Sequence, residues 1–124
     1  MDYKPRIAII GAGVTGLTAI KQCLVAELEP ICFEQTAQTG GLWRYTEITD
    51  ENQNPHSSVY RSTVINTSKE HMTFSDFPIP EDWPPFLPHY KVAETNCILS
   101  PRYYDMYADK FRLWPHIRFN TTVL

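Results

Sequence analysis

A short apolar run that ends in a glycine cluster is the feature that most constrains how this chain can fold. Residues 7–10 are Ile-Ala-Ile-Ile, and a G-x-G-x-x-G pattern follows at once at Gly11, Gly13 and Gly16. Such a run is typical of a central strand in a parallel sheet. The first glycine allows a tight turn, the second lets backbone N–H groups approach a pyrophosphate, and the third lets a helix lie close to the strand. We therefore expect a dinucleotide-binding turn whose helix N-terminus offers hydrogen-bond donors and partial positive charge to phosphates.

A helix and a second strand complete this unit. Apolar residues recur at intervals of three and four, which places them on one face of a helix reaching to about Glu27. Pro30 stops the pattern, residues 31–33 form a second apolar strand, and Glu34 follows it, 18 residues beyond Gly16. A carboxylate at that point accepts hydrogen bonds from ribose hydroxyls. NAD and the ADP half of FAD present the same groups, so the motif does not separate them. The apolar helix positions are Leu17, Ile20, Leu24 and Leu28.

Composition excludes several other classes of protein. The 124 residues suffice for one domain and are too few for two. Eleven Lys and Arg against fourteen Asp and Glu give a net charge of −3 without a basic stripe, so nucleic-acid binding is not expected. The three cysteines contain no C-x-x-C pair and the four histidines are scattered, so neither a disulfide framework nor a metal site is expected. The apolar run at residues 7–10 is too short for a signal peptide or a membrane span.

The middle of the chain is less regular. Residues 35–58 are polar and turn-rich apart from 42–45, so we expect loops, with or without a short strand, and an exposed loop tip at 50–55. Residues 59–74 are ambiguous between a short helix and pieces of strand. Five prolines between positions 78 and 88 predict an extended segment. Such a segment can be a ligand for an aromatic-lined groove, but its interleaved aromatic residues favour packing onto its own domain. These aromatic residues are Phe77, Trp83 and Phe86.

The last part of the sequence, from residue 100 onward, predicts one more helix and one more strand. Ser100 and Pro101 form a helix start, with the hydroxyl as N-cap and the proline at the first helical position. An aromatic helix face continues until Pro115. Residues 117–123 alternate between apolar and polar, so we expect a strand, and the sequence stops inside it. The aromatic face consists of Tyr104, Tyr107, Phe111 and Trp114.

Several segments carry a resemblance that is more specific than the glycine pattern. The doublet Gly40-Gly41, six and seven positions after Glu34, resembles the two-dinucleotide-binding flavoproteins. From Arg6 to about Pro88, and again from the helix at Tyr103, the chain resembles the amino-terminal part of the flavin-containing monooxygenases. The segments are Gly40-Gly41-Leu42-Trp43-Arg44-Tyr45, Val59-Tyr60-Arg61-Ser62, Ile65-Asn66-Thr67-Ser68-Lys69-Glu70-His71-Met72 and Asp76-Phe77-Pro78-Ile79-Pro80.

The resemblance implies a fold, a domain layout and a set of site residues. It implies an α/β, Rossmann-type FAD-binding three-layer fold, of which residues 1–124 are the incomplete N-terminal part, without the NADP-binding domain. Asn66 matches the asparagine that lies beside the flavin ring, where a neutral amide can hydrogen-bond without exchanging a proton. From the residues alone, an Asn in such a segment is more often a turn residue. The implied cofactor-binding residues are Gly11, Ala12, Gly13, Val14, Thr15, Gly16, Glu34, Gly41, Leu42, Trp43, Asn66 and Thr67.

The same resemblance implies an activity. In this family, also called the N-oxide-forming dimethylaniline monooxygenases, NADPH reduces the FAD. Oxygen then adds to give a C4a-hydroperoxide, which oxygenates a soft nitrogen or sulfur nucleophile. The partners implied are an amine or sulfide substrate and O2. The location implied is the cytoplasmic face of the endoplasmic reticulum membrane for full-length relatives, and the cytoplasm for this chain alone. The alternatives are a truncated, inactive FAD-binding module, an FAD-dependent amine oxidase, and a Baeyer–Villiger monooxygenase.

Three departures from the family pattern qualify this resemblance. The NADP-binding glycine fingerprint and the Phe-x-Gly-x-x-x-His signature, which come later in relatives, do not occur in these 124 residues. Glu27 stands where relatives commonly carry a glycine, and a left-handed conformation there would cost roughly 1 kcal/mol. Residues 91–100 resemble an insertion.

Overall fold

The computed structural model describes residues 4–45, 63, 66–83 and 101–124. The chain divides into two compact units, Met1–Gly41 with Tyr104–Leu124, and Leu42–Tyr103. The expected loop tip at 50–55, the helix cap at Ser100 and the insertion at 91–100 lie outside the described residues. Among the helices that the structure describes, none is both long enough and apolar enough to cross a membrane.

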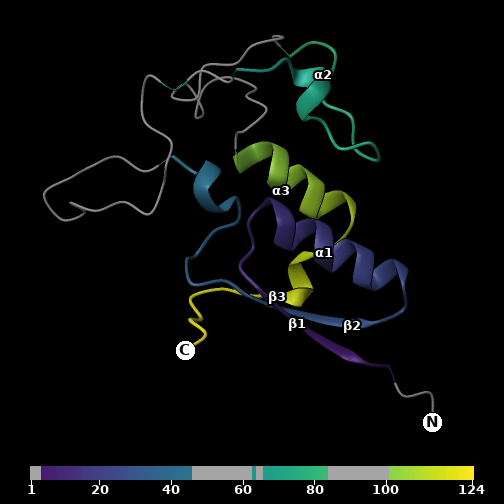
Figure 1. The fold of residues 1–124 in the computed structure, drawn as a ribbon, viewed down its shortest axis with the longest axis vertical. Coiled ribbons are helices and arrows are strands. Elements are labelled where there is room, and N and C mark those ends of the chain that lie inside the picture. Colours follow the sequence, from purple (N-terminus) through teal and green to yellow (C-terminus); the bar gives the residue numbers. More distant parts are fainter. Residues whose placement is uncertain (1–3, 46–62, 64–65, 84–100) are drawn as a thin grey trace, which may run out of the picture. The chain divides into compact units, whose positions relative to one another are not determined.

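The first unit is built on a parallel sheet with the order β1-β2-β3. β1 (Arg6–Ile10) pairs with β2 (Glu29–Phe33) from Arg6↔Glu29 to Ile10↔Phe33. The connection between them is α1 (Val14–Val25), which lies on one face of the sheet (Figure 1). This is the expected strand, helix, strand unit, and it confirms the α/β class. Of the three expected layers, the described residues contain the sheet and α1, which covers one of its faces.

The expected apolar face of α1 forms the centre of this unit's core. Leu17 and Ile20 are completely buried, whereas Leu24 and Leu28 are half-buried. Burial of the first two explains why the periodicity of the sequence located this helix correctly. Other buried apolar residues of the unit include Ala12, Pro30, Cys32, Tyr104, Tyr107, Ala108, Leu113 and Ile117.

α1 ends two residues before the expected position, in a left-handed turn at Glu27. Glu27 has φ +57, its N–H donates to the Leu24 carbonyl at 3.1 Å, and the Leu28 N–H donates to the Cys23 carbonyl at 2.9 Å. These two bonds define a Schellman motif with Glu27 at the position that favours glycine. Glu27 therefore adopts the left-handed conformation for which we expected strain.

α3 (Pro101–Lys110) ends in the same way, at Arg112, which has φ +55. The Leu113 N–H donates to the Ala108 carbonyl at 2.9 Å. The expectation that the helical face continues to Trp114 is wrong, because the left-handed residue turns the chain first. Trp114 lies instead in a 3-10 turn, η2 (Trp114–His116).

The third strand is also shorter than expected. β3 (Ile117–Arg118) pairs with Cys32 and Phe33 of β2, and the expected strand over residues 117–123 is wrong beyond Arg118. The reason is Asn120, whose φ of +52 breaks the extended conformation. Its N–H donates to the Thr36 carbonyl at 3.0 Å, so the chain follows the turn after β2.

The second unit is organised around the side chain of Tyr103. Its hydroxyl donates to the Phe77 carbonyl at 2.7 Å and accepts from the Phe74 N–H at 3.1 Å. Its ring lies 5.6 Å from that of Phe74, 5.3 Å from that of Phe77 and 6.5 Å from that of Trp83. Trp83 is only 4% exposed, which confirms that this part of the proline-rich segment packs onto its own domain.

A short helix, α2 (Lys69–Met72), also belongs to the second unit. It resolves the ambiguity of residues 59–74 in favour of a helix for these four positions. η1 (Gly41–Trp43) is a 3-10 turn at the boundary between the two units.

Candidate functional site

The glycine loop joins the end of β1 to the start of α1, and two of its glycines are required by the backbone. Gly11 has φ +92, and its N–H donates to the Phe33 carbonyl at 2.8 Å. A side chain is strained at that φ. A β-carbon on Gly16 would overlap the carbonyl of Gly11. The predicted roles of these two glycines, a tight turn and close helix packing, therefore have a direct steric basis.

Gly13 occupies the N-cap position of α1, and because glycine has no side chain it cannot accept a hydrogen bond from the first turn. Its φ of −76 and ψ of −169 are extended, and no side chain of the described residues caps the helix. The N–H groups of the first turn, which begins at Val14 and Thr15, have no intrahelical acceptor because a helix start always leaves them unpaired. Val14 is half-buried and Thr15 is exposed. Such a turn combines free donors with partial positive charge, which suits a phosphate.

A second glycine turn, residues 39–41, lies against the first. The Gly40 N–H donates to the Ala12 carbonyl at 3.0 Å. Gly41 has φ +55, and a β-carbon on it would lie 3.2 Å from the Gly13 Cα, tighter than ordinary van der Waals contact. Close approach of one backbone to another thus explains Gly41, and a φ of +104 explains Gly40. The structure brings Gly41 to the glycine loop, as the site prediction required.

Glu34 links the glycine loop to the end of β2. It is 6% exposed, and its Oε2 accepts a hydrogen bond from the Ala12 N–H at 2.7 Å. Its Oε1 accepts from both the N–H and the hydroxyl of Thr36, each at 2.8 Å. Three donors satisfy the buried carboxylate, whose two oxygens have about four acceptor positions. One acceptor position of the carboxylate remains for a hydroxyl of a ligand. The sequence did not reveal that the other three positions accept hydrogen bonds from the protein itself.

A hollow of about 180 Å³ lies beside Glu34, at the carboxyl ends of β1 and β2. In open α/β sheets this edge is where ligands bind. Sequence reasoning included Gly11 and Glu34 among the site residues but missed Thr121, Thr122 and Val123, because it placed them inside the third strand. A strand that ends at Arg118 would have made the residues beyond it candidates for this edge of the sheet. The lining residues are Ile10, Gly11, Phe33, Glu34, Gln35, Thr121, Thr122 and Val123.

Cys32 lies beneath the loop and has a structural role. It is completely buried, and its thiol donates to the Gly11 carbonyl at 3.5 Å. Burial, together with the negative charge of Glu34, raises the pKa of the Cys32 thiol to about 11. A protonated thiol is a poor nucleophile, so Cys32 has no covalent role at neutral pH.

The remaining predicted site residues begin at η1 and belong to the second unit. Leu42 is 52% exposed and Trp43 is half-buried. Asn66 is exposed, and Thr67 beside it is half-buried. The Oγ1 of Thr67 is buried and has no hydrogen-bond partner among the described residues. A buried hydroxyl without a partner costs stability unless a ligand atom satisfies it.

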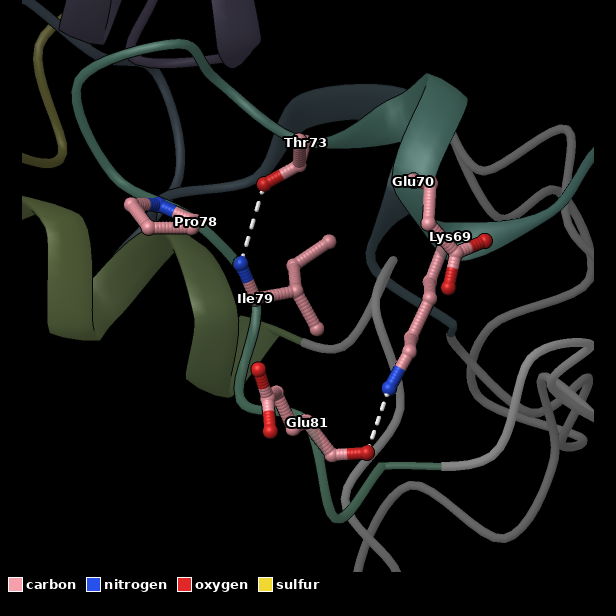
Figure 2. Close-up of a pocket in the computed structure, with 6 residues that line it drawn as sticks. All are labelled: Lys69, Glu70, Thr73, Pro78, Ile79 and Glu81. Atoms are coloured by element: carbon pink, nitrogen blue, oxygen red, sulfur yellow. Dashed lines mark hydrogen bonds between the residues drawn. The ribbon is translucent and has the colours of Figure 1, made fainter.

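The second unit also contains a hollow of about 430 Å³ next to α2 (Figure 2). The ammonium of Lys69 donates to the carbonyls of Pro80 at 3.1 Å, Glu81 at 2.6 Å and Trp83 at 2.7 Å. On another wall, the Thr73 hydroxyl accepts from the Ile79 N–H at 2.9 Å. These bonds fix the turn at residues 80–83, so Lys69 acts in the fold of this unit.

Comparison with known proteins identifies the family of the chain. The family model of flavin-binding monooxygenase-like proteins matches residues 4–124. Flavin-containing monooxygenase 5 of Homo sapiens is 49% identical over 120 residues, which cover 97% of this chain and 20% of that protein. Dimethylaniline monooxygenase (N-oxide-forming) 2 of Cavia porcellus is 46% identical over 119 residues, covering 96% and 20%. The chain thus spans about one fifth of the length of these curated relatives.

Solved structures show the same fold. S-allyl-L-cysteine S-oxygenase from Allium sativum matches with a TM-score of 0.76 and 26% identity, over 95% of this chain and 28% of that one. OTEMO in complex with FAD and NADP matches with a TM-score of 0.68 and 24% identity, over 97% and 20%, which supports the fold alone. With the family match over residues 4–124, the chain belongs to the flavin-binding monooxygenase-like family.

Proposed function

We propose that residues 1–124 form the N-terminal part of the FAD-binding domain of an NADPH-dependent flavin monooxygenase. The NADP-binding domain lies outside these residues. The substrates of the whole enzyme are soft nitrogen or sulfur nucleophiles together with O2. The relatives named above, an S-oxygenase and an N-oxide-forming monooxygenase, support these two substrate classes. Location at the cytoplasmic face of the endoplasmic reticulum is part of the proposal and rests on resemblance alone.

The observation that carries the proposal is the pair of apposed glycine turns at the uncapped start of α1. Gly13 has no side chain to compete for the N–H groups of the first helical turn, and Gly41 approaches it without a β-carbon. A pyrophosphate placed there is held by backbone donors and by the helix dipole. Glu34 retains one acceptor position for a ribose hydroxyl. When bound, FAD supplies the redox chemistry, and the protein binds and orients it.

We extend the proposal to Asn66 and Thr67 as residues that contact the flavin. Asn66 is exposed, and its amide can both donate and accept hydrogen bonds. The unpaired hydroxyl of Thr67 is a polar atom whose burial a cofactor atom would compensate. In the full-length enzyme, Asn66→Ala should lower the rate of substrate oxygenation. An unchanged rate would remove Asn66 from the catalytic site.

The cofactor assignment is tested by titrating the 124-residue chain with FAD and following flavin fluorescence. The wild-type chain should bind FAD, and Gly13→Val should weaken binding at least about tenfold, since its γ-carbons occupy space reserved for the pyrophosphate. Ala26→Val adds comparable bulk at the opposite, exposed end of α1 and serves as the matched control. It should bind FAD like the wild type.

Two results would contradict this assignment. If Gly13→Val binds FAD as tightly as the wild type, the pyrophosphate does not lie on the glycine loop. If the isolated chain oxidises NADPH, residues 1–124 contain a complete catalytic site and are not the FAD-binding part alone.

A further inference from the structure

Two polar side chains from distant parts of the sequence meet behind the second glycine turn. The hydroxyl of Thr39 donates to the Oδ1 of Asp105 at 2.6 Å, and 66 positions separate the two residues. Thr39 is 1% exposed, and Asp105 lies on α3, half-buried. A short hydrogen bond from a buried hydroxyl to a carboxylate is charge-assisted and stronger than a neutral one. Neither Thr39 nor Asp105 belongs to the glycine pattern or to the predicted set of site residues.

A series of backbone contacts leads from this bond to the glycine loop. Thr39 precedes Gly40, whose N–H donates to the Ala12 carbonyl at 3.0 Å. Ala12 is completely buried, and its own N–H is held by Glu34 at 2.7 Å. The peptide groups of Ala12 are therefore held on one side by the end of β2 and on the other by residues 39–41. Asp105 fixes the second of these contacts, because it fixes Thr39.

Asp105 lies on a part of α3 that is held rigidly, so it can hold Thr39 in place. Its neighbours on α3, Tyr104 and Tyr107, are 3% and 1% exposed, so this part of the helix is anchored in the core of the first unit. The negative charge of Asp105 also allows a positioning effect on ligand affinity to be distinguished from an electrostatic one. Removing an anionic group near an anionic ligand should strengthen binding by Coulomb's law. A loss of affinity on removal would therefore report positioning and not charge.

We propose that Asp105 is a positioning residue of the dinucleotide site. Through Thr39 it holds residues 39–41 against the glycine loop and so maintains the space in which a pyrophosphate binds. This inference rests on the proposed FAD site, and it adds a residue on a helix that does not contain the nucleotide-binding pattern.

The test uses the 124-residue chain and two measurements. One is the amide hydrogen exchange rate of Gly40 without ligand, and the other is the dissociation constant for FAD. Thr39→Val and Asp105→Leu should each raise both quantities about tenfold, and the double variant should add little, since both changes remove the hydrogen bond between Thr39 and Asp105. Thr39→Ser and Asp105→Asn keep a donor and an acceptor, so both should stay within about threefold of the wild type.

The matched control is Thr73→Val in the second unit. It makes the same substitution at another hydrogen-bonded hydroxyl, which donates to the Phe77 carbonyl and accepts from the Ile79 N–H. It should leave the exchange rate of Gly40 unchanged. If Thr39→Val does not fold, Asp105→Ala compared with Asp105→Asn makes the same comparison through the other partner.

The outcomes separate this inference from the proposed function. A wild-type chain that does not bind FAD overturns the FAD site, while the exchange rate of Gly40 still reports whether Asp105 orders the turn. Unchanged exchange in Thr39→Val overturns the positioning role. So does faster exchange with unchanged FAD affinity, because the turn would then be ordered without consequence for the cofactor.

Discussion

Replacing Glu34 with glutamine tests whether this carboxylate serves the fold as well as the ligand. The structure assigns its two oxygens to three donors, one on Ala12 and two on Thr36. A glutamine side chain has one oxygen and one NH2 group. The less costly orientation keeps the oxygen toward Thr36 and turns the NH2 group toward the N–H of Ala12, which is completely buried.

The magnitude follows from that geometry. The hydrogen bond from Ala12 to a charged group, about 1.5–3 kcal/mol, is lost, and the two bonds from Thr36 weaken toward the roughly 1 kcal/mol of neutral bonds. Relief from burying a charge offsets part of this loss. We expect Glu34→Gln to lower the free energy of unfolding by about 2–3 kcal/mol in the absence of FAD.

Denaturant unfolding of the ligand-free chain measures this change, read from the midpoint at constant slope. Gln35→Ala, at the exposed neighbouring position, is the control and should change stability by less than about 0.5 kcal/mol. If Glu34 served only to bind a ligand, its replacement would lower FAD affinity without lowering the free energy of unfolding. If Glu34→Gln leaves stability unchanged or raises it, while FAD affinity falls, the structural role of the carboxylate is refuted.

Three further predictions concern the turn after α1, the buried thiol and the second unit. Glu27→Gly should raise the free energy of unfolding by about 0.5–1 kcal/mol, because relief of the left-handed strain exceeds the entropy of a glycine, and a Tm rise of about 2–6 °C would show it. Glu27→Ala keeps the β-carbon and should give no gain; an equal gain would contradict the strain argument. The raised pKa of Cys32 keeps its thiol protonated in the folded chain while the unfolded chain ionises from about pH 9. Stability should therefore fall between pH 9 and pH 11 more steeply in the wild type than in Cys32→Ala, and parallel curves would refute this. Tyr103→Phe removes two hydrogen bonds and should destabilise the second unit by about 1–3 kcal/mol, as measured by hydrogen exchange of the Phe74 amide, and unchanged exchange would count against it.

The local elements of the first unit were readable from sequence because their signals are local. The apolar run before Gly11 and the periodicity of α1 identified β1, α1 and β2 in the right order. The expectation of a central strand at residues 7–10 is wrong for the described sheet, in which β1 lies at the edge and β2 in the centre. The reasons for Gly11 and Gly16 could also be stated in advance, because tight turns and close helix packing require glycine whatever surrounds them.

The errors occurred where single residues adopt left-handed conformations. Arg112 ends α3 before Trp114, and Asn120 ends β3 after Arg118. Neither Arg nor Asn has to adopt a positive φ, so the periodic patterns around them continued without interruption. Local bonds of the helix end hold the turn at Arg112, whereas the Asn120 N–H donates to the Thr36 carbonyl, far away in the sequence. Periodic sequence patterns do not reveal either kind of bond.

The proposed dinucleotide site shows the same division between local and long-range information. Its glycines, the start of its helix and Glu34 follow from the order of residues along the chain. Three features depend on tertiary contacts: the hold of Glu34 on Ala12, the apposition of Gly41 and Gly13, and the anchoring of Thr39 by Asp105. They join positions 22, 28 and 66 residues apart. Contacts at such separations exist only once the sheet has formed and α3 has packed, so the folded chain, and not the pattern, gives the site its geometry.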